Sequence, residues 1–156
     1  MNQPPRRSGV PHGFDWPIRV YYEDTDAGGI VFYANYLKFF ERARTEWLRA
    51  CGVDQRTLAE QNGLVFVVSE TAVQYRAPAR LDDILTIVSR IERLGRASVE
   101  FAQEARRGDV VLAAGTIRVG CVEHGTLRPA ALPQSVSDAL RREPRVFQAG
   151  MSTAHA

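Results

Sequence analysis

The stretch YYEDTDAGGIVFYANYLKFFERA, residues 21–43, sets three carboxylates and two adjacent glycines directly before a run rich in aromatic residues. From residue 31 to residue 51, apolar side chains recur at spacings of three and four residues: Tyr36, Phe40, Ala43, Trp47 and Cys51. Side chains with this spacing share one face of a helix. The sequence therefore predicts an amphipathic helix over residues 31–51, about twenty residues and roughly 30 Å long, which ends at Gly52.

Strand patterns dominate the remainder of the chain. Four long runs alternate apolar with polar residues, at residues 64–77, 83–94, 97–107 and 109–123. This alternation is typical of half-buried strands, and the short connections between the runs predict antiparallel neighbours in a meander. An earlier strand is expected over residues 17–24. The predicted fold class is α+β, with a curved antiparallel sheet of about five strands around one long central helix.

The chain is expected to form one domain with a tail at each end. At 156 residues it is long enough for one substantial core. The domain is predicted over residues 16–142, with two short helices at residues 55–63 and 133–142. The flanking segments 1–15 and 143–156 lack a sustained pattern, so both are predicted to be flexible tails.

Charge and cysteine content exclude several classes of protein. The net charge is +2, and no block of Lys and Arg gathers it, so nucleic-acid binding is not expected. No apolar run reaches the ~18 residues of a membrane span, and the N-terminus lacks the apolar core of a signal peptide. Cys51 and Cys121 fit no metal or redox spacing. We expect a cytoplasmic protein with two buried thiols and no metal site.

Exposed apolar surface argues for self-association. A helix that carries aromatic side chains on several sides needs cover from more than one sheet, and an open sheet has unpaired edges. Dimerisation through a strand edge would satisfy both requirements. We therefore expect a homodimer or a homotetramer built as a pair of dimers.

The acidic stretch is placed by this scheme in the loop between the first strand and the start of the long helix. A helix start offers unpaired backbone N–H groups that can hold an anion or a developing oxyanion. Gly28 and Gly29 permit a tight turn and close approach of a ligand to the backbone. A carboxylate beside such donors would be a usable catalytic pair.

Other interpretations of the acids compete with a catalytic one. Asp24 and Asp26 could be turn residues or helix caps. A calcium loop is excluded because Asn35 stands where the twelfth-position Glu is required. The glycines match no phosphate-binding loop, and no histidine lies where it would serve a nucleophile.

The motif YYEDTDAGGIVFYANYLKFFERARTEWLR, followed by QYRAPARLDDILTI, resembles the Tol-Pal-associated (YbgC-type) acyl-CoA thioesterases within the 4-hydroxybenzoyl-CoA thioesterase branch of the hotdog fold. The resemblance covers residues 17–140. It implies hydrolysis of an acyl-CoA at sites on a dimer interface, with Asp26 as the catalytic carboxylate and Asp24 in support. It also implies that the backbone N–H of Tyr33 donates a hydrogen bond to the thioester carbonyl. Many YbgC-type members carry His where this chain has Tyr33.

The resemblance fits the chemistry of a thioester. Asp26 could activate a water as general base or attack the carbonyl itself, and the general base is preferred. No cofactor is expected, since coenzyme A is part of the substrate. By the same resemblance Arg96, with Arg93 beside it, is the candidate for binding the phosphates of coenzyme A. Ordinary exposed hairpin arginines are the competing interpretation.

Two further functions stay open at this point. One is a hotdog hydratase, an enzyme that usually needs a histidine near the helix, and none is found there in this sequence. A non-catalytic acyl-thioester-binding or scaffolding module would dock on envelope or lipid-synthesis proteins, and the family resemblance keeps a Tol-Pal link or an acyl carrier protein as possible partners. Another hotdog branch places its carboxylate on the central helix, but Glu41 falls on the charged face and is expected to be a surface residue.

Overall fold

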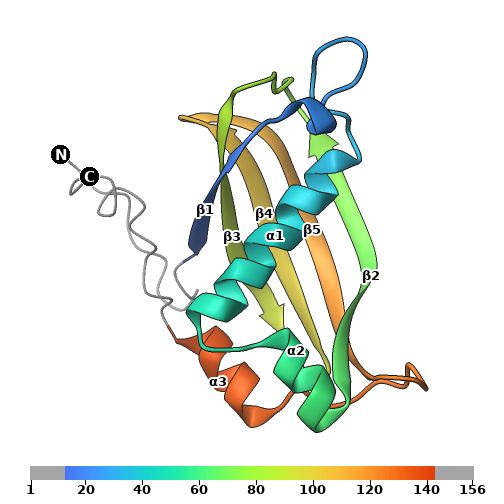
Figure 1. Ribbon diagram of the computed structural model, residues 1–156. Helices are drawn as coiled ribbons and strands as arrows, with labels where there is room; N and C mark the ends of the chain where they lie inside the picture. Colours follow the sequence, from blue (N-terminus) through green and yellow to red (C-terminus); the bar gives the residue numbers. More distant parts are fainter. Residues whose placement is uncertain (1–12, 143–156) are drawn as a thin grey trace, which may run out of the picture.

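One curved antiparallel sheet wraps around helix α1 (Asn35–Ala50) in the computed structural model, which describes residues 13–142 (Figure 1). The sheet has five strands: β1 (Phe14–Arg19), β2 (Leu64–Tyr75), β3 (Ile84–Leu94), β4 (Ser98–Arg107) and β5 (Val110–Glu123). The short elements are η1 (Tyr22–Asp24), α2 (Gln55–Thr57), η2 (Leu58–Asn62) and α3 (Gln134–Arg141). The predicted α+β architecture is confirmed.

The order of the strands differs from the predicted four-strand meander. The order across the sheet is β1-β3-β4-β5-β2, so only β3, β4 and β5 form a meander. The prediction was wrong for β2, which pairs with β5 at the far edge, because β1 occupies the free side of β3. The connection between β2 and β3 instead packs on the chain that leads into α1. Its Ala79 is fully buried and accepts a hydrogen bond from the Val31 N–H at 2.9 Å.

Helix α1 begins four residues later than the helical spacing predicts. Ile30 bridges Arg80, and Val31 bridges Thr25, so residues 30 and 31 are extended and paired rather than helical. An apolar residue in a bridge and one in a helix look alike in the sequence. The bridges therefore shift the start of the helix from residue 31 to Asn35.

The other boundaries agree less well at the N-terminal end than elsewhere. Strand β1 begins at Phe14, two residues before the predicted start of the domain, and ends at Arg19. The chain then forms a 3-10 turn at Tyr22–Asp24, where the first strand was predicted to continue. The two short helices are present, and η2 ends at Gly63 with a φ of 65°. The tail predictions fall mainly outside the described residues.

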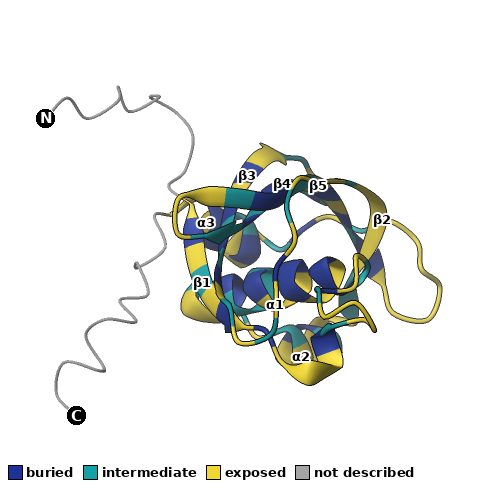
Figure 2. Cartoon of the chain, turned by 90° about the horizontal axis from the view of Figure 1, so that it is seen from above, coloured by how far each residue is buried: buried dark blue, intermediate teal, exposed yellow. Residues whose placement is uncertain are grey.

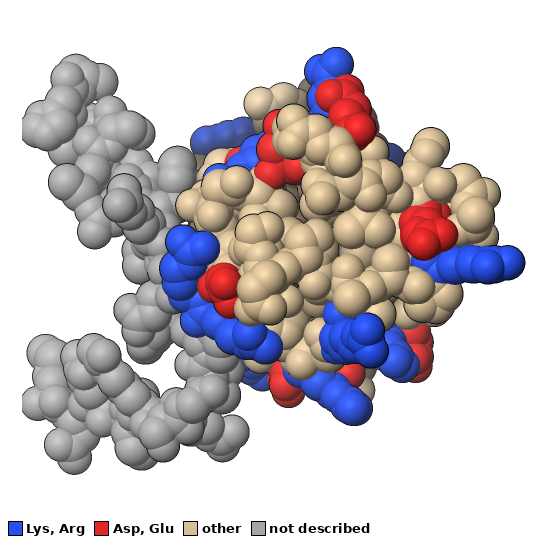
Figure 3. All heavy atoms as spheres, turned by 90° about the horizontal axis from the view of Figure 1, so that it is seen from below, with Lys and Arg blue, Asp and Glu red and all other residues tan. Residues whose placement is uncertain are grey.

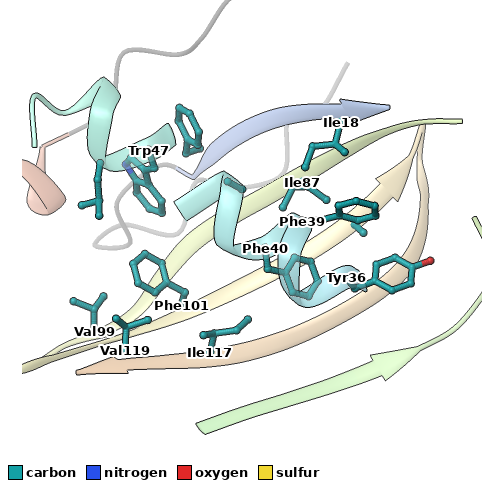
Figure 4. Packing of buried hydrophobic residues seen from close by; sticks show 14 of the residues in the cluster. Ile18, Tyr36, Phe39, Phe40, Trp47, Ile87, Val99, Phe101, Ile117 and Val119 are labelled. Carbon is teal, nitrogen blue, oxygen red and sulfur yellow. The ribbon is translucent and has the colours of Figure 1, made fainter. Parts of the chain in front are cut away.

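The core lies between α1 and the concave face of the sheet (Figure 4). Phe39, Phe40 and Trp47 are fully buried on the inward face of the helix. The Trp47 ring meets that of Phe101 edge-on at 5.9 Å and stacks on Phe14 at 6.0 Å. Burying each large apolar side chain contributes about 1.5–3 kcal/mol, so this face fixes the helix on the sheet.

Strand β2 is the exposed edge of the sheet. The first residues of β2 are half-buried, and most of the residues after them are exposed, as the colour of β2 shows in Figure 2. Val67, Val68 and Tyr75 are 38%, 50% and 47% exposed. A long edge strand with exposed apolar side chains is a template for pairing with another strand.

A polar contact crosses the core beneath the helix. Gln103 on β4 is buried, and its amide donates to the Phe40 carbonyl at 3.0 Å and to the Ser89 hydroxyl at 2.8 Å. The Gln103 amide oxygen accepts a hydrogen bond from the Arg44 guanidinium at 2.9 Å. One side chain thus links the helix backbone, a helix cation and a neighbouring strand.

Replacing Gln103 by Leu should lower the free energy of unfolding by about 2–4 kcal/mol, because it leaves the partly buried Arg44 cation without its acceptor. Urea unfolding at a fixed protein concentration measures the change. Gln61→Leu, exposed on η2, is the control and should change stability by less than about 0.5 kcal/mol. Equal effects of the two substitutions would contradict the importance of the network.

Candidate active site

A small hairpin leads into helix α1 and carries the acidic residues of the sequence. The Phe32 N–H donates to the Asp24 carbonyl at 2.9 Å, and the Asp26 N–H donates to the Ile30 carbonyl at 2.9 Å. Thr25 and Val31 form a bridge between them. The hairpin tip therefore consists of residues 27–29, and the chain returns to the start of the helix.

The Asp26 carboxylate is fixed by one of its two oxygens. Its Oδ1 accepts hydrogen bonds from the N–H of Gly28 at 2.8 Å and of Ile30 at 3.4 Å. Among the described residues, nothing donates to its Oδ2. The side chain is exposed. The turn role and the catalytic role considered from the sequence are compatible, because they use different oxygens.

The two positions at the hairpin tip require glycine for different structural reasons. Gly29 has a φ of 78°, which side chains other than glycine rarely adopt. A Cβ on Gly28 would lie 3.2 Å from Oδ1 of Asp26. Glycine at position 28 therefore lets the backbone approach the carboxylate closely enough to hold it.

Asp24 is buried and joins the turn before the hairpin to the helix after it. Its Oδ2 accepts from the Tyr21 N–H at 2.8 Å, and its Oδ1 accepts from the Asn35 amide at 2.6 Å. Asn35 is itself buried at the first position of α1. The sequence singled out Asn35 only as a poor calcium ligand, because the pairing with Asp24 across the hairpin leaves no local pattern.

Tyr33 lies at the junction between the hairpin and α1. The Asn35 N–H donates to the Phe32 carbonyl and the Tyr36 N–H to the Tyr33 carbonyl, at 2.8 and 3.4 Å. Within residues 13–142, no acceptor engages the N–H of Tyr33. Three residues of chain separate Ile30, which pairs with Asp26, from Tyr33, at most about 10 Å. The carboxylate and an unpaired backbone donor thus belong to one short segment at the helix start.

Aromatic side chains surround this junction. The Tyr33 ring lies 4.8 Å from that of Phe32 and meets that of Tyr75 edge-on at 6.1 Å. Tyr75 also lies 5.6 Å from Tyr36. Burial raises the pKa of the Tyr36 and Tyr75 phenols, so both stay neutral at physiological pH. Tyr75, at the end of β2, was not recognised from the sequence, because it reaches the site only through the strand order.

The predicted phosphate-binding arginines lie at the opposite end of the sheet. Arg93 and Arg96 belong to the β3–β4 hairpin, whereas the acidic hairpin packs beside the start of β3, roughly 30 Å away along the strand. Both line a polar hollow of about 220 Å³ with Arg118 and Glu100. The structure does not bring these arginines to Asp26 within one chain.

The basic side chains at this end do not form a stripe. Seen from below, Lys and Arg side chains surround a largely uncharged centre and alternate with acids (Figure 3). Several of the arginines are already paired, including Arg49 with Glu46 at 2.6 Å. Such a surface lacks the continuous positive track that a nucleic-acid backbone requires.

Three other expectations from the sequence concern Glu41, a metal site and a membrane span. Glu41 is exposed and accepts a hydrogen bond from the Thr45 hydroxyl at 2.9 Å, as expected for the helix surface. Within residues 13–142, no three His, Cys, Asp or Glu side chains gather as a metal site would require. No helix in the same range is long and apolar enough to span a membrane.

Comparison with known proteins identifies the family. The family model described as Thioesterase superfamily matches residues 28–114. The chain is 45% identical to "Acyl-CoA thioesterase YbgC" of Haemophilus influenzae over 128 residues, which cover 82% of this chain and 94% of that protein. It is 34% identical to the YbgC acyl-CoA thioesterase of Helicobacter pylori over 78% of this chain and 96% of that protein.

Solved structures agree with the sequence relatives. A probable thioesterase from Bartonella henselae superposes with a TM-score of 0.74 at 36% identity, covering 78% of this chain and 99% of that one. The sheet wrapped on a central helix is therefore the hotdog fold, as the sequence resemblance implied. The chain belongs to the thioesterase superfamily, with YbgC acyl-CoA thioesterases among its relatives, and is itself a thioester hydrolase.

Proposed function

We propose that this protein hydrolyses acyl-CoA to a free acid and coenzyme A, with Asp26 as the catalytic carboxylate. The observation that carries the proposal is the state of the Asp26 side chain. Two backbone N–H groups hold Oδ1, while Oδ2 has no donor among the described residues. A carboxylate held in this way keeps its orientation and still has an oxygen available to accept a proton.

The reaction follows from the two groups at the helix start. The thioester carbonyl oxygen accepts a hydrogen bond from the Tyr33 N–H, where the positive end of the helix stabilises developing negative charge. Asp26 Oδ2 takes a proton from a water whose oxygen attacks the carbonyl carbon. The C–S bond then breaks, and the proton passes from Asp26 to the sulfur of the leaving thiolate.

General-base action is preferred over nucleophilic attack by Asp26. The bonds from Gly28 and Ile30 hold the carboxylate at the hairpin, which suits a group that orients a water. Hydration of an enoyl thioester and non-catalytic binding are not favoured, because the relatives are hydrolases and the carboxylate is in place.

Substituting Asp26 by Asn should lower kcat by at least ~10²-fold, since the amide keeps the turn but cannot take a proton at neutral pH. Thiol release from a panel of short, long and aromatic acyl-CoAs measures this, with circular dichroism as the folding check. Glu23→Gln, on the neighbouring exposed acid, should keep kcat within about twofold. An Asp26→Asn variant that folds and retains full activity would refute the assignment.

Asp24 and Asn35 are proposed to position the hairpin rather than touch the substrate. Asn35→Ala removes the donor to a buried carboxylate, so unfolding stability should fall by about 1–3 kcal/mol. The kcat of the folded variant should fall about tenfold, because Asp26 and the helix start lose their fixed relation. Asn62→Ala, at the end of η2, is the control. A variant that loses stability but keeps wild-type kcat well below its Tm would argue for a structural role alone.

A homodimer through the β2 edge is proposed as the active form. Strand β2 ends at Tyr75 beside the acidic hairpin, and it begins at Leu64, at the same end of the sheet as the β3–β4 hairpin. Two β2 edges related by a twofold axis pair antiparallel, so the start of one lies beside the end of the other. Such pairing would also cover the exposed Val68 and Tyr75.

In that dimer, one substrate would contact both protomers. Arg93 and Arg96 of one protomer would approach the Asp26 end of its partner, although they are far from Asp26 in their own chain. They are exposed in the polar hollow, where they are proposed to bind the phosphates of coenzyme A. The separation of the predicted residues within one chain therefore supports a site made from two chains.

The cellular location and the partners are proposed from the free thiols and from the family resemblance. Both cysteines are free thiols, which fits a cytoplasmic enzyme. The proposed reaction requires no cofactor beyond the coenzyme A of the substrate. A homotetramer, an acyl carrier protein as carrier and a Tol-Pal link stay predictions from the family resemblance.

A further inference from the structure

The connection between β2 and β3 runs beside the acidic hairpin and adds a third extended segment to it. The Val31 N–H donates to the Ala79 carbonyl at 2.9 Å, and Ile30 forms an antiparallel bridge with Arg80. On its other side Ile30 pairs with Asp26, whose N–H donates to the Ile30 carbonyl at 2.9 Å. The hairpin arm that follows the tip is therefore held between the Asp26 arm and the connection.

Ile30 also holds the Asp26 side chain. Its N–H donates to Asp26 Oδ1 at 3.4 Å, in addition to the 2.8 Å bond from the Gly28 N–H. A change in the position of Ile30 therefore displaces both the backbone and the carboxylate of Asp26. The bond between Asp24 and Asn35 fixes the ends of the hairpin, whereas the connection supports its side.

An ion pair fastens the connection to the end of β4. Arg107 Nη1 donates to Asp83 Oδ2 at 2.8 Å and to the Pro78 carbonyl at 3.2 Å. The same Asp83 oxygen accepts a hydrogen bond from the Arg80 N–H at 2.9 Å, and the Asp83 N–H donates to the Arg80 carbonyl at 3.1 Å. Residues 78–80 are thus bound at both ends to this pair.

The pair is ionised and open to solvent. Burial alone would raise the pKa of Asp83, but hydrogen bonds from the Arg80 N–H and from Arg107 hold it below its usual value, so the carboxylate is charged at neutral pH. The Arg107 side chain is 41% exposed and that of Asp83 is 24% exposed. A pair this accessible to water contributes little to the stability of the whole fold. Its removal should leave the chain folded.

We propose that Asp83 and Arg107 position Asp26 for catalysis by holding residues 78–80 against the acidic hairpin. With Asp26 as the catalytic carboxylate of the proposed function, on which this role rests, the general base must lie within about 3 Å of its water. In the described part of the chain neither charged side chain forms a hydrogen bond to the hairpin, so its effect passes through the backbone of the connection. A misplacement of about 1 Å can lower a rate about 10²-fold. A pair that adds little stability can therefore still be important for kcat.

Replacing Arg107 by Met removes the charge and both hydrogen bonds of the guanidinium but keeps a long unbranched side chain. The kcat of Arg107→Met should be about tenfold below that of the wild type and its KM within about twofold, because the substrate contacts remain and only the carboxylate is misplaced. Arg107→Lys, whose cation can still reach Asp83, should recover kcat to within about threefold of the wild type. A folded Arg107→Met enzyme with wild-type kcat would overturn the proposal.

The matched control is Arg141→Met. It removes an exposed ion pair with Asp138, 4.0 Å long, in α3 at the far end of the molecule from the acidic hairpin (Figure 1). Its kcat should stay within about twofold of the wild type. A tenfold loss in the control as well would show that the effect is not specific to the connection.

Combination with Asp26→Asn tests whether Arg107 acts through Asp26. In that background Arg107→Met should lower the remaining kcat by less than about twofold, because no carboxylate is left to misplace. A tenfold loss in both backgrounds would overturn the proposal, since the pair would then act on another group. Failure of the proposed function looks different, because Asp26→Asn alone would then keep full activity, whatever the effect of Arg107→Met.

Amide hydrogen exchange reports on the hairpin itself and requires no turnover. The Val31 N–H, bonded to the Ala79 carbonyl, should exchange at least tenfold faster in Arg107→Met than in the wild type or in Arg141→Met, because the connection is freer to move away. Unchanged exchange together with a lower kcat would contradict a route through the connection.

A second variant, Asp83→Asn, covers the case in which Arg107→Met does not fold. The amide keeps an acceptor for the Arg80 N–H but loses the ion pair, so kcat should fall about threefold with KM again within about twofold. The loss should disappear when Asp26 is already Asn. Wild-type kcat in a folded Asp83→Asn enzyme would contradict positioning by this pair.

Discussion

The hydrogen bond between the Asp24 carboxylate and the Asn35 amide, 2.6 Å long, is the contact on which the candidate active site depends. Both side chains are buried, so each would be costly to leave unpaired. Their bond joins the turn that follows β1 to the first residue of α1. The hairpin between them therefore has fixed ends, and the Asp26 carboxylate and the Tyr33 N–H keep their places beside the helix start.

The same fold explains why one chain does not complete the site. A helix lying across a curved sheet has its start near one end of the strands, so the arginines of the β3–β4 hairpin lie at the other end. The strand order leaves β2 free at the edge, with its last residue beside the acidic hairpin and its first residue at the same end of the sheet as the β3–β4 hairpin. Antiparallel pairing of two β2 edges is the simplest arrangement that brings an Asp26 and a phosphate-binding hairpin together.

The sequence predicted well those elements in which a regular apolar pattern runs over ten or more consecutive residues. The spacing of Phe40, Ala43 and Trp47 indicated α1, and alternation indicated the four late strands within one or two residues. The start of α1 was misplaced because Ile30 and Val31 form bridges with Arg80 and Thr25, and apolar character does not distinguish a bridge from a helix. The edge position of β2 and the contacts of Tyr75 and Gln103 depend on the strand order, and the contact of Asn35 depends on pairing across the hairpin. No local pattern encodes either of them.

Complementation in mixed dimers tests most directly whether each site is built from two chains. Asp26→Asn and the double substitution Arg93→Glu, Arg96→Glu are co-expressed with different tags, and the heterodimer is isolated and assayed at low acyl-CoA concentration. In the two-chain arrangement, one site of each heterodimer keeps both Asp26 and the arginines, so activity should return to about half that of the wild type. If each chain supplied its own site, both sites would carry a defect, and the heterodimer would be as inactive as its parents.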